Sequence, residues 1–385
     1  MEYTALHWKL KECFTGDPEA VTQMGEGVSL YRLSFQSSGD PASAMLTASN
    51  TVPGFLNDDD AIQKNNQFYY YVLKAEGKPD AKRCIVLLHG LNERSWDKYL
   101  PWGHTLVRKT GCPVILFPIA YHMNRSPEFW RNPRKMMPFV LKRQDKLPDV
   151  QKLSVANVAL SERMTMQPQR FFLSGYQAAY DLLQLIGDIS AGKHPFFPTA
   201  PQVDFFSYSI GAFLTQVMML ANPNGCFNKS KFFFFCGGSV FFDMHGISRY
   251  ILDSTAFERL LHYYKNEMEQ DAKTNCKIGQ ILNDTLLGQS FKAMLSMKGL
   301  KKYSTRLFAD FQDRLKVVTL TQDTVIIPEK VKQVLSGVDV EEENYDFGCS
   351  HEVPFPICSN NLVNQVNGAF ERLFTKAATF FTSPC

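Results

Sequence analysis

A serine at position 209 stands in a sequence whose residue types suit nucleophilic catalysis. An apolar segment, residues 203–206, leads into Ser-Tyr-Ser-Ile-Gly at residues 207–211, and a helical pattern begins directly afterwards. A serine hydroxyl is a weak nucleophile unless it is exposed and lies beside a base. A strand, a tight turn and a helix expose it, and small residues two positions before and after let the two backbones approach. The pattern predicts Ser209 as a nucleophile, with Ser207 where glycine is usual.

An acid and a histidine follow this serine in an order that completes such a site. Asp323 comes just after an apolar run at residues 316–320, and His351 lies in a turn-rich loop before the last helical pattern. We expect His351 to take the Ser209 proton and return it to the leaving group. We expect Asp323 to hold the imidazole in the required tautomer and to stabilise its protonated form. Asp243, which follows a Phe-rich run, is an alternative acid.

Two backbone N–H groups are candidates for an oxyanion hole, which stabilises the charge that develops on a carbonyl oxygen during acyl transfer. One belongs to Ile210, directly after the serine, and the other to Leu91, which follows His89 and Gly90 at the end of an apolar run. We interpret His89 as a structural hydrogen-bonding residue in this turn rather than as a catalytic one.

The elements that must position these residues alternate between strands and helices. Apolar, aromatic or β-branched runs predict strands at residues 67–73, 83–88, 114–119, 203–206, 231–236 and 316–320. Apolar residues at helical spacing predict helices at residues 102–108, 177–189 and 362–381. This α/β pattern predicts a mostly parallel central sheet flanked by helices, and catalytic groups gather at the carboxyl edge of such a sheet.

The turn at residues 89–90, the serine turn, the Asp-Thr-Val-Ile-Ile-Pro run at residues 323–328 and the late histidine occur in the order of the α/β-hydrolase superfamily. Over residues 67–381 the chain resembles a poorly characterised branch of that superfamily. The resemblance implies the α/β-hydrolase fold and a serine-hydrolase mechanism for Ser209, Asp323 and His351. It does not imply a substrate.

The chain is predicted to consist of an N-terminal extension, a core with an insert, and a long helical segment. We expect an N-terminal extension, residues 1–66, packed on a core of residues 67–238 and 313–385 that carries an insert at residues 120–165. Residues 239–312 have mostly helical patterns. Because this segment leaves and rejoins the core near the catalytic edge, we expect a helical lid or cap, with a purely structural excursion as the alternative.

The insert at residues 120–165 is rich in basic residues. Arg125, Arg131, Arg134 and Lys135 either bind an acidic group of a substrate or form a solvated face.

Composition and charge argue against several classes of function. The 41 Lys and Arg residues against 38 Asp and Glu give a net charge of +3, and they are dispersed, so we expect no nucleic-acid partner. No segment approaches the ~18 apolar residues of a membrane span. Neither a phosphate-binding glycine motif nor a zinc spacing occurs, so we expect no cofactor and no metal. Nine scattered cysteines and the lack of a leader pattern predict a cytoplasmic location.

Together these features predict a serine hydrolase that cleaves an ester, thioester or related acyl bond of a small-molecule substrate through an acyl-enzyme. A non-catalytic α/β-hydrolase-like protein that binds a ligand or partner is the main alternative, since the fold does not guarantee activity. A hydrolase-fold enzyme with other chemistry, a lyase or a peptidase, is a third hypothesis. The acyl group, the leaving group and the oligomeric state stay open.

Overall fold

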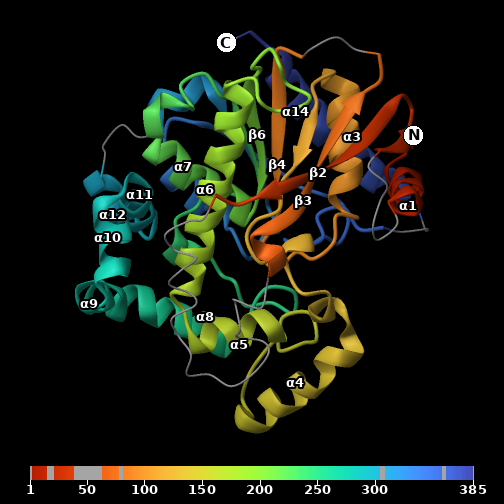
Figure 1. Ribbon diagram of the computed structural model, residues 1–385. Coiled ribbons are helices and arrows are strands. Elements are labelled where there is room, and N and C mark those ends of the chain that lie inside the picture. Colours follow the sequence, from red (N-terminus) through yellow and green to blue (C-terminus); the bar gives the residue numbers. More distant parts are fainter. Residues whose placement is uncertain are drawn as a thin grey trace.

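A twisted sheet runs through the middle of the molecule (Figure 1). The computed structural model describes residues 2–14, 21–38, 63–77, 81–303, 308–357 and 361–384. In this part of the chain nine strands form one sheet, in the order β1-β2-β3-β5-β4-β6-β7-β8-β9. The strands are β1 (Val21–Gly25), β2 (Val28–Gln36), β3 (Gln67–Ala75), β4 (Arg83–Leu88), β5 (Val114–Leu116), β6 (Gln202–Tyr208), β7 (Phe232–Phe235), β8 (Leu315–Leu320) and β9 (Asp339–Glu343).

The strand directions establish the fold class. Neighbouring strands from β1 to β3 are antiparallel, and β3 is also antiparallel to β5. All further neighbours, from β5 through β4 to β9, are parallel. An antiparallel strand beside β5, the exchanged positions of β4 and β5, and the parallel run to β9 are the arrangement of the α/β-hydrolase fold. The predicted fold class is therefore confirmed.

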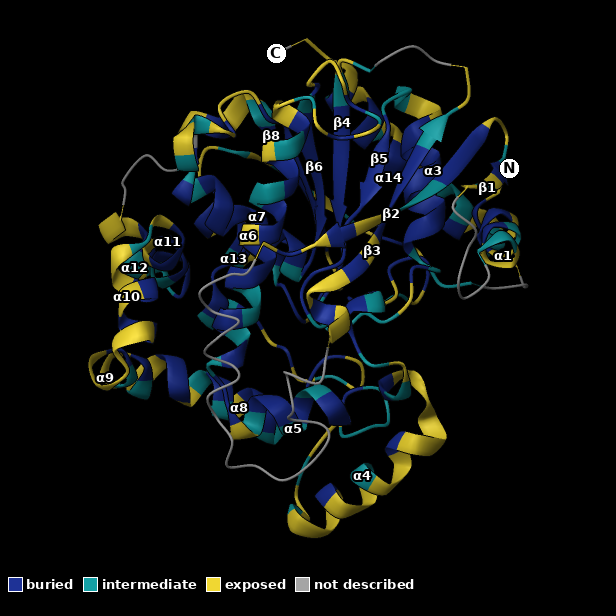
Figure 2. Cartoon of the chain, in the orientation of Figure 1, coloured by how far each residue is buried: buried dark blue, intermediate teal, exposed yellow. Residues whose placement is uncertain are grey.

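Helices cover both faces of the sheet. They are α1 (Tyr3–Cys13), α3 (Tyr99–Thr110), α4 (Pro133–Lys146), α5 (Val158–Met166), α6 (Arg170–Ser190), α7 (Ile210–Ala221), α8 (Ser254–His262), α9 (Met268–Thr274), α10 (Cys276–Asp284), α11 (Leu286–Met294), α12 (Met297–Tyr303), α13 (Pro328–Val334) and α14 (Val363–Thr382). One face packs on α1, α3 and α14, and the other on α6, α7 and α13. The central strands are buried throughout (Figure 2), which explains their continuous apolar sequences.

Alternate side chains of a strand belong to these two cores. Phe205 of β6 lies in the core with α6 and α7, whereas Phe206 lies in the other core, where its ring centroid is 6.0 Å from that of Trp102. The centroids of Phe206 and Phe374 of α14 are 5.6 Å apart. This period-two alternation fixes the register of β6, and with it the position of the serine that follows the strand.

Three strands and one strand end differ from the sequence prediction. The N-terminal extension contributes β1 and β2 to the sheet itself, and β9 forms the opposite edge. Lys316 of β8 pairs with both Asp339 and Glu341 of β9, so this edge is rich in charge rather than apolar. The strand predicted at residues 114–119 ends at Leu116, shortly before Pro118, which cannot donate a ladder hydrogen bond.

The two long segments form helices outside the sheet. The insert at residues 120–165 carries α4 and α5, and residues 239–312 carry α8 to α12. In Figure 1, α4, α5 and α8 lie together beyond one end of the sheet, and α9 to α12 lie along one flank. Helix α8 packs against α5, and α11 packs against α7 and α6. The second segment thus packs on the helix that follows the predicted nucleophile, and the insert packs on α8 of that segment.

Candidate active site

Ser209 occupies the sharp turn between β6 and α7. Its backbone has φ 56° and ψ −120°, an unusual conformation for a residue other than glycine. A Cβ atom at Gly211 would lie 2.8 Å from Leu88 Cβ and 2.9 Å from Leu88 O, so only glycine lets α7 begin this close to the end of β4. The turn therefore has the geometry that places a serine side chain above the carboxyl edge of the sheet.

A threonine compensates for the serine that replaces the usual glycine at position 207. The Ser207 and Thr215 hydroxyl oxygens are 2.7 Å apart in a buried contact. Thr215 uses its own proton to donate to Gly211 O, at 2.8 Å, so Ser207 must be the donor to Thr215. The extra hydroxyl is satisfied inside the turn, and the close approach at Gly211 is kept.

Ser209, His351 and Asp323 form a hydrogen-bonded chain. The Ser209 Oγ lies 2.6 Å from His351 Nε2, and His351 Nδ1 lies 2.7 Å from Asp323 Oδ2. A carboxylate only accepts hydrogen bonds, so Nδ1 carries the imidazole proton and Nε2 is free to accept the Ser209 proton. The three residues are 5%, 4% and 5% exposed. The alternative acid, Asp243, lies elsewhere and is 3.9 Å from Lys330.

The carboxylate of Asp323 is held on every side. Its Oδ1 accepts hydrogen bonds from the backbone N–H groups of Val325 and Ile326, both at 2.9 Å. The buried Cys236 thiol lies close to this carboxylate, and burial together with the negative charge of Asp323 raises the pKa of the thiol well above its ordinary value. The thiol therefore stays protonated. Sequence reasoning missed Cys236, because only the fold brings the end of β7 beside the acid.

The histidine is positioned by the residue just before the serine. The rings of Tyr208 and His351 are stacked, with centroids 5.6 Å apart and planes 17° from parallel. The Tyr208 hydroxyl donates to the backbone oxygen of His351. Burial raises the pKa of Tyr208 well above its ordinary value, so the hydroxyl keeps the proton that it donates. The end of β6 thus holds both Ser209 and His351 in place.

An ionic network joins the loop after β4 to the histidine loop. Lys98 pairs with Glu93 and donates to Glu352 O at 3.1 Å. Tyr99 donates to Glu93 at 3.0 Å, and its oxygen accepts from the Gly90 N–H at 2.9 Å. The loop that carries the predicted oxyanion-hole residue is therefore tied to the residue next to His351.

The loop after β4 and the start of α7 present two backbone donors. No described residue accepts a hydrogen bond from the N–H of Leu91 or of Ile210. His89 Nε2 accepts from the Ile119 N–H at 2.9 Å, so Nδ1 is the protonated nitrogen that donates to Gly90 O at 2.9 Å. Burial lowers the pKa of His89 well below its ordinary value, consistent with a neutral ring. His89 shapes this turn, as the sequence analysis inferred.

A narrow apolar cavity lies beside these donors. Its volume is about 60 Å³, and its wall includes Leu91, Ile210, Phe171, Phe213, Leu287 and Phe291. Leu287 and Phe291 belong to α11, and so to the segment predicted to be a lid. Since ligand pockets usually have volumes of about 300–1,000 Å³, this cavity accepts only a few atoms unless the surrounding helices move.

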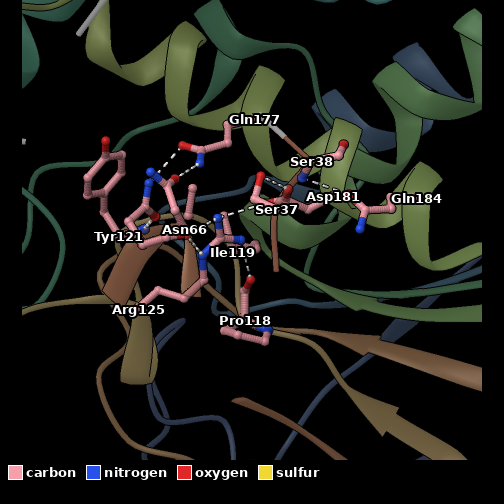
Figure 3. Close-up of polar contacts among 12 residues, drawn as sticks. Ser37, Ser38, Asn66, Pro118, Ile119, Tyr121, Arg125, Gln177, Asp181 and Gln184 are labelled. Carbon is pink, nitrogen blue, oxygen red and sulfur yellow. Dashed lines mark hydrogen bonds and ion pairs between the residues drawn. The ribbon is translucent and has the colours of Figure 1, made fainter. Parts of the chain in front are cut away.

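Arg125 does not face this region, although the sequence allowed it a role in binding an acidic group. It is fully buried and pairs with Asp181 at 2.6 Å (Figure 3). It also donates to Pro118 O at 3.1 Å and to Asn65 O at 2.8 Å. Asp181 accepts a further hydrogen bond from Ser37 at 2.6 Å. This network fastens the segment after β5 to α6, so the role of Arg125 is structural.

The other basic residues singled out in the insert lie at the surface. Arg131, Arg134 and Lys135 are exposed and line a wide outer groove. Among the described residues, no group of three or more His, Cys, Asp or Glu side chains is placed to hold a metal ion. Within the same residues, no helix is both long and apolar enough to cross a membrane.

Several solved structures resemble this one at low sequence identity. Esterase Est22 is 11% identical with a TM-score of 0.48, over 99% of this chain and 88% of that chain. The peroxisomal α/β-hydrolase Lpx1 of Saccharomyces cerevisiae is 13% identical with a TM-score of 0.40, over 94% and 92%. Carboxyl esterase 2 of Tuber melanosporum is 12% identical with a TM-score of 0.40, over 82% of both chains. The fold assignment rests on the strand order and directions given above.

No curated protein matches this sequence. One family model, described as a family of unknown function (DUF6051), matches residues 1–382. This match spans nearly the whole chain, including the elbow, the acid and the histidine. The protein therefore belongs to the DUF6051 family.

Proposed function

We propose that this protein is a serine hydrolase that cleaves an ester, thioester or related acyl bond of a small molecule. The observation that carries the proposal is the buried chain of hydrogen bonds from Ser209 through His351 to Asp323. In such a chain the base lies within hydrogen-bond reach of the nucleophile and is itself oriented by a third group. The strained turn at Ser209 supports the same role.

In the first half of the proposed reaction, Ser209 Oγ attacks the substrate carbonyl carbon while His351 Nε2 takes the hydroxyl proton. The new imidazolium is stabilised by Asp323, which stays ionised. When the tetrahedral intermediate collapses, the bond to the leaving oxygen or sulfur breaks and His351 returns the proton to it. A water molecule then attacks the acyl-enzyme by the same steps, which releases the acid and restores Ser209.

The oxyanion that forms in each half-reaction needs fixed donors. The N–H groups of Leu91 and Ile210 fit this role, because both residues line the same cavity and no described residue already uses either N–H. Losing one such donor typically lowers turnover by about 100- to 1,000-fold. The ionic network of Glu93, Lys98 and Tyr99 would hold the loop that carries Leu91.

The small apolar cavity favours a small or medium acyl group over a polymer. We propose that residues 239–312 act as a lid, because α11 supplies part of the cavity wall and Ser209 is only 5% exposed. Two predictions from the sequence stay predictions. One is the division of the chain into extension, core and lid, and the other is the cytoplasmic location.

Labelling with a fluorophosphonate probe tests the proposal directly. The reagent forms a covalent bond with an activated serine, so the wild-type protein should be labelled stoichiometrically and Ser209→Ala should not react. A peptide map that places the label on Ser209 would support the mechanism. A folded wild-type protein that fails to react, and that hydrolyses none of a panel of short-chain esters and thioesters, would favour the non-catalytic binding hypothesis.

A further inference from the structure

A second, more polar cavity adjoins the apolar one. Its volume is about 30 Å³, and the two cavities share Leu91, His122, Phe171 and Ser174 in their walls. The remaining wall comes from the loop after β4, from the insert at residues 120–165, and from α6 and α8. A molecule whose reacting carbonyl lies at the Leu91 N–H could therefore extend into either cavity.

Two side chains in the wall of the polar cavity have donors that no described residue satisfies. The Nε and Nη1 atoms of Arg94 are buried and have no hydrogen-bond partner among the described residues, although its Nη2 donates to Asn92 at 2.7 Å. The indole N–H of Trp130, which is 4% exposed, is likewise buried with no partner in the described part of the chain. An unsatisfied buried donor costs about 1–3 kcal/mol, and more when it is charged. Such groups are uncommon in folded proteins and call for a ligand or another explanation.

The side chains around this cavity carry positive charge. The Arg94 guanidinium lies 5.3 Å from the centre of the Trp130 ring, and Arg163 lies 5.1 Å from the same ring. Burial and the nearby Arg131 and Arg163 lower the pKa of Arg94, because each disfavours its positive charge. Among the described residues that line the cavity, Glu93 is the only carboxylate, and Glu93 is already paired with Lys98.

We propose that this cavity binds a carboxylate of the substrate, so that the enzyme acts on esters or thioesters that carry a second, ionised acid group. The inference rests on the proposed hydrolase function and names its substrate class. A carboxylate accepts charge-assisted hydrogen bonds from a planar guanidinium, and it would also accept from the Trp130 N–H. Because Nε and Nη1 lie on different edges of the guanidinium, one carboxylate would satisfy one of these two atoms together with the Trp130 N–H, and it would neutralise the charge of Arg94.

Arg94 and Trp130 also line an adjoining pocket of about 460 Å³, so a molecule that enters from outside can reach their donors. Arg94 is three residues after Leu91, and both residues line the polar cavity. A carboxylate at Arg94 and a reacting carbonyl at Leu91 can therefore belong to one small molecule.

Matched substrate pairs test the inference in the purified full-length protein. Hydrolysis is followed by pH-stat titration. Monomethyl succinate, glutarate and adipate are compared with methyl esters of the same chain length that lack the free carboxylate. O-acetyl hydroxy acids are compared in the same way with alkyl acetates. The first series places the carboxylate on the acyl side and the second on the alcohol side. At least one charged ester should have a kcat/KM about tenfold or more above that of its uncharged match.

Variants of Arg94 test whether the polar cavity causes the preference for charged esters. Arg94→Met should lower kcat/KM for the charged ester by about 10- to 100-fold, the range expected when charge-assisted hydrogen bonds are lost, and change the uncharged ester by less than about threefold. Arg94→Lys keeps the positive charge but loses the planar guanidinium, so its kcat/KM for the charged ester should lie between those of the wild type and Arg94→Met. Arg134→Met, which removes an exposed arginine of the insert at residues 120–165, should change kcat/KM for neither substrate.

A binding measurement separates this inference from the proposed function. Monomethyl glutarate should bind to Ser209→Ala in isothermal titration calorimetry, and binding should be lost in Ser209→Ala/Arg94→Met. If Ser209-dependent hydrolysis shows no preference for charged esters, or if Arg94→Met slows both classes equally, the carboxylate site is refuted and the hydrolase survives. If Ser209 is inert but monomethyl glutarate binds through Arg94, the hydrolase proposal fails and the carboxylate site stands.

Discussion

Replacing Asp323 by asparagine tests the assignment of the acid most sharply, because the structure dictates how the amide would sit. Oδ1 accepts two backbone N–H groups, from Val325 and Ile326, each at 2.9 Å. The asparagine side chain of the Asp323→Asn variant keeps those two hydrogen bonds only if its oxygen takes the Oδ1 position. Its NH₂ group must then face His351 Nδ1, where the carboxylate oxygen was 2.7 Å away.

This orientation reverses the tautomer of His351. Facing a donor, Nδ1 must become the acceptor, so the imidazole proton moves to Nε2 and points at Ser209 Oγ. The base can then no longer accept the Ser209 proton. The same substitution in a well-studied triad lowers kcat by about 10⁴-fold, and we expect a similar loss here, equivalent to about 5.5 kcal/mol of transition-state stabilisation.

The assay is kcat/KM on a short-chain ester, together with the rate of fluorophosphonate labelling and a urea unfolding curve to verify folding. Asp243→Asn is the matched control, because Asp243 was the alternative acid and lies near Lys330 instead of the histidine. We expect that control to stay within about threefold of wild type. A folded Asp323→Asn protein that keeps more than a tenth of the activity would refute the assignment, as would a severe loss in Asp243→Asn.

Three further predictions concern the scaffold. Thr215→Val should lower the free energy of unfolding by about 1–3 kcal/mol, because the buried Ser207 hydroxyl loses its acceptor; an unchanged urea midpoint would mean that the hydroxyl finds another partner. Arg125→Met should cost about 3–5 kcal/mol, because it leaves Asp181 charged and buried, whereas Arg134→Met should cost less than about 0.5 kcal/mol. Burial lowers the pKa of His122 and His194 to about 4, so between about pH 6.5 and 4 the unfolded chain binds more protons than the folded one and stability should fall as the pH falls. His194→Gln should flatten that decline in urea midpoints measured from pH 7 to 4.5, and an equally steep decline would contradict the assignment.

Sequence patterns predicted the parts of the fold that are locally encoded. The continuous apolar runs of β4, β6 and β7 are buried on both faces, so their identity could be read without tertiary information. The strands β1 and β2 were missed within a mixed N-terminal region, although the Gly-Glu-Gly turn at residues 25–27 is a usable signal for a hairpin. Strand β9 was missed because its residues are acidic rather than apolar. They form ion pairs with Lys316 and Lys376, which are distant in the sequence.

In the candidate site, too, some residues could be predicted from local sequence patterns and others could not. Ser209 could be found because a sharp turn between strand and helix leaves a local signature, and Asp323 and His351 because chain order restricts the candidates. The Cys236 thiol beside the acid has no signature, since its role depends on the neighbouring strand. Nor does the sequence indicate which arginine of several is left with unsatisfied donors. In the structure Arg125 is buried and paired with Asp181, whereas two atoms of Arg94 have no partner among the described residues.

The packing of α1 against α14 constrains the time course of folding. The ring of Tyr3 stacks on Phe370 at 4.4 Å, and its hydroxyl donates to Phe355 O, 352 residues later in the chain. Contacts of such high sequence separation slow folding. On the ribosome, α1 and α3 can pack on this face early, but the part that α14 covers, including the contact of Phe206 with Phe374, stays exposed until α14 has been synthesised. Chaperones that shield apolar surface would therefore matter most late in synthesis, when nearly all of the sheet exists but its last helix does not.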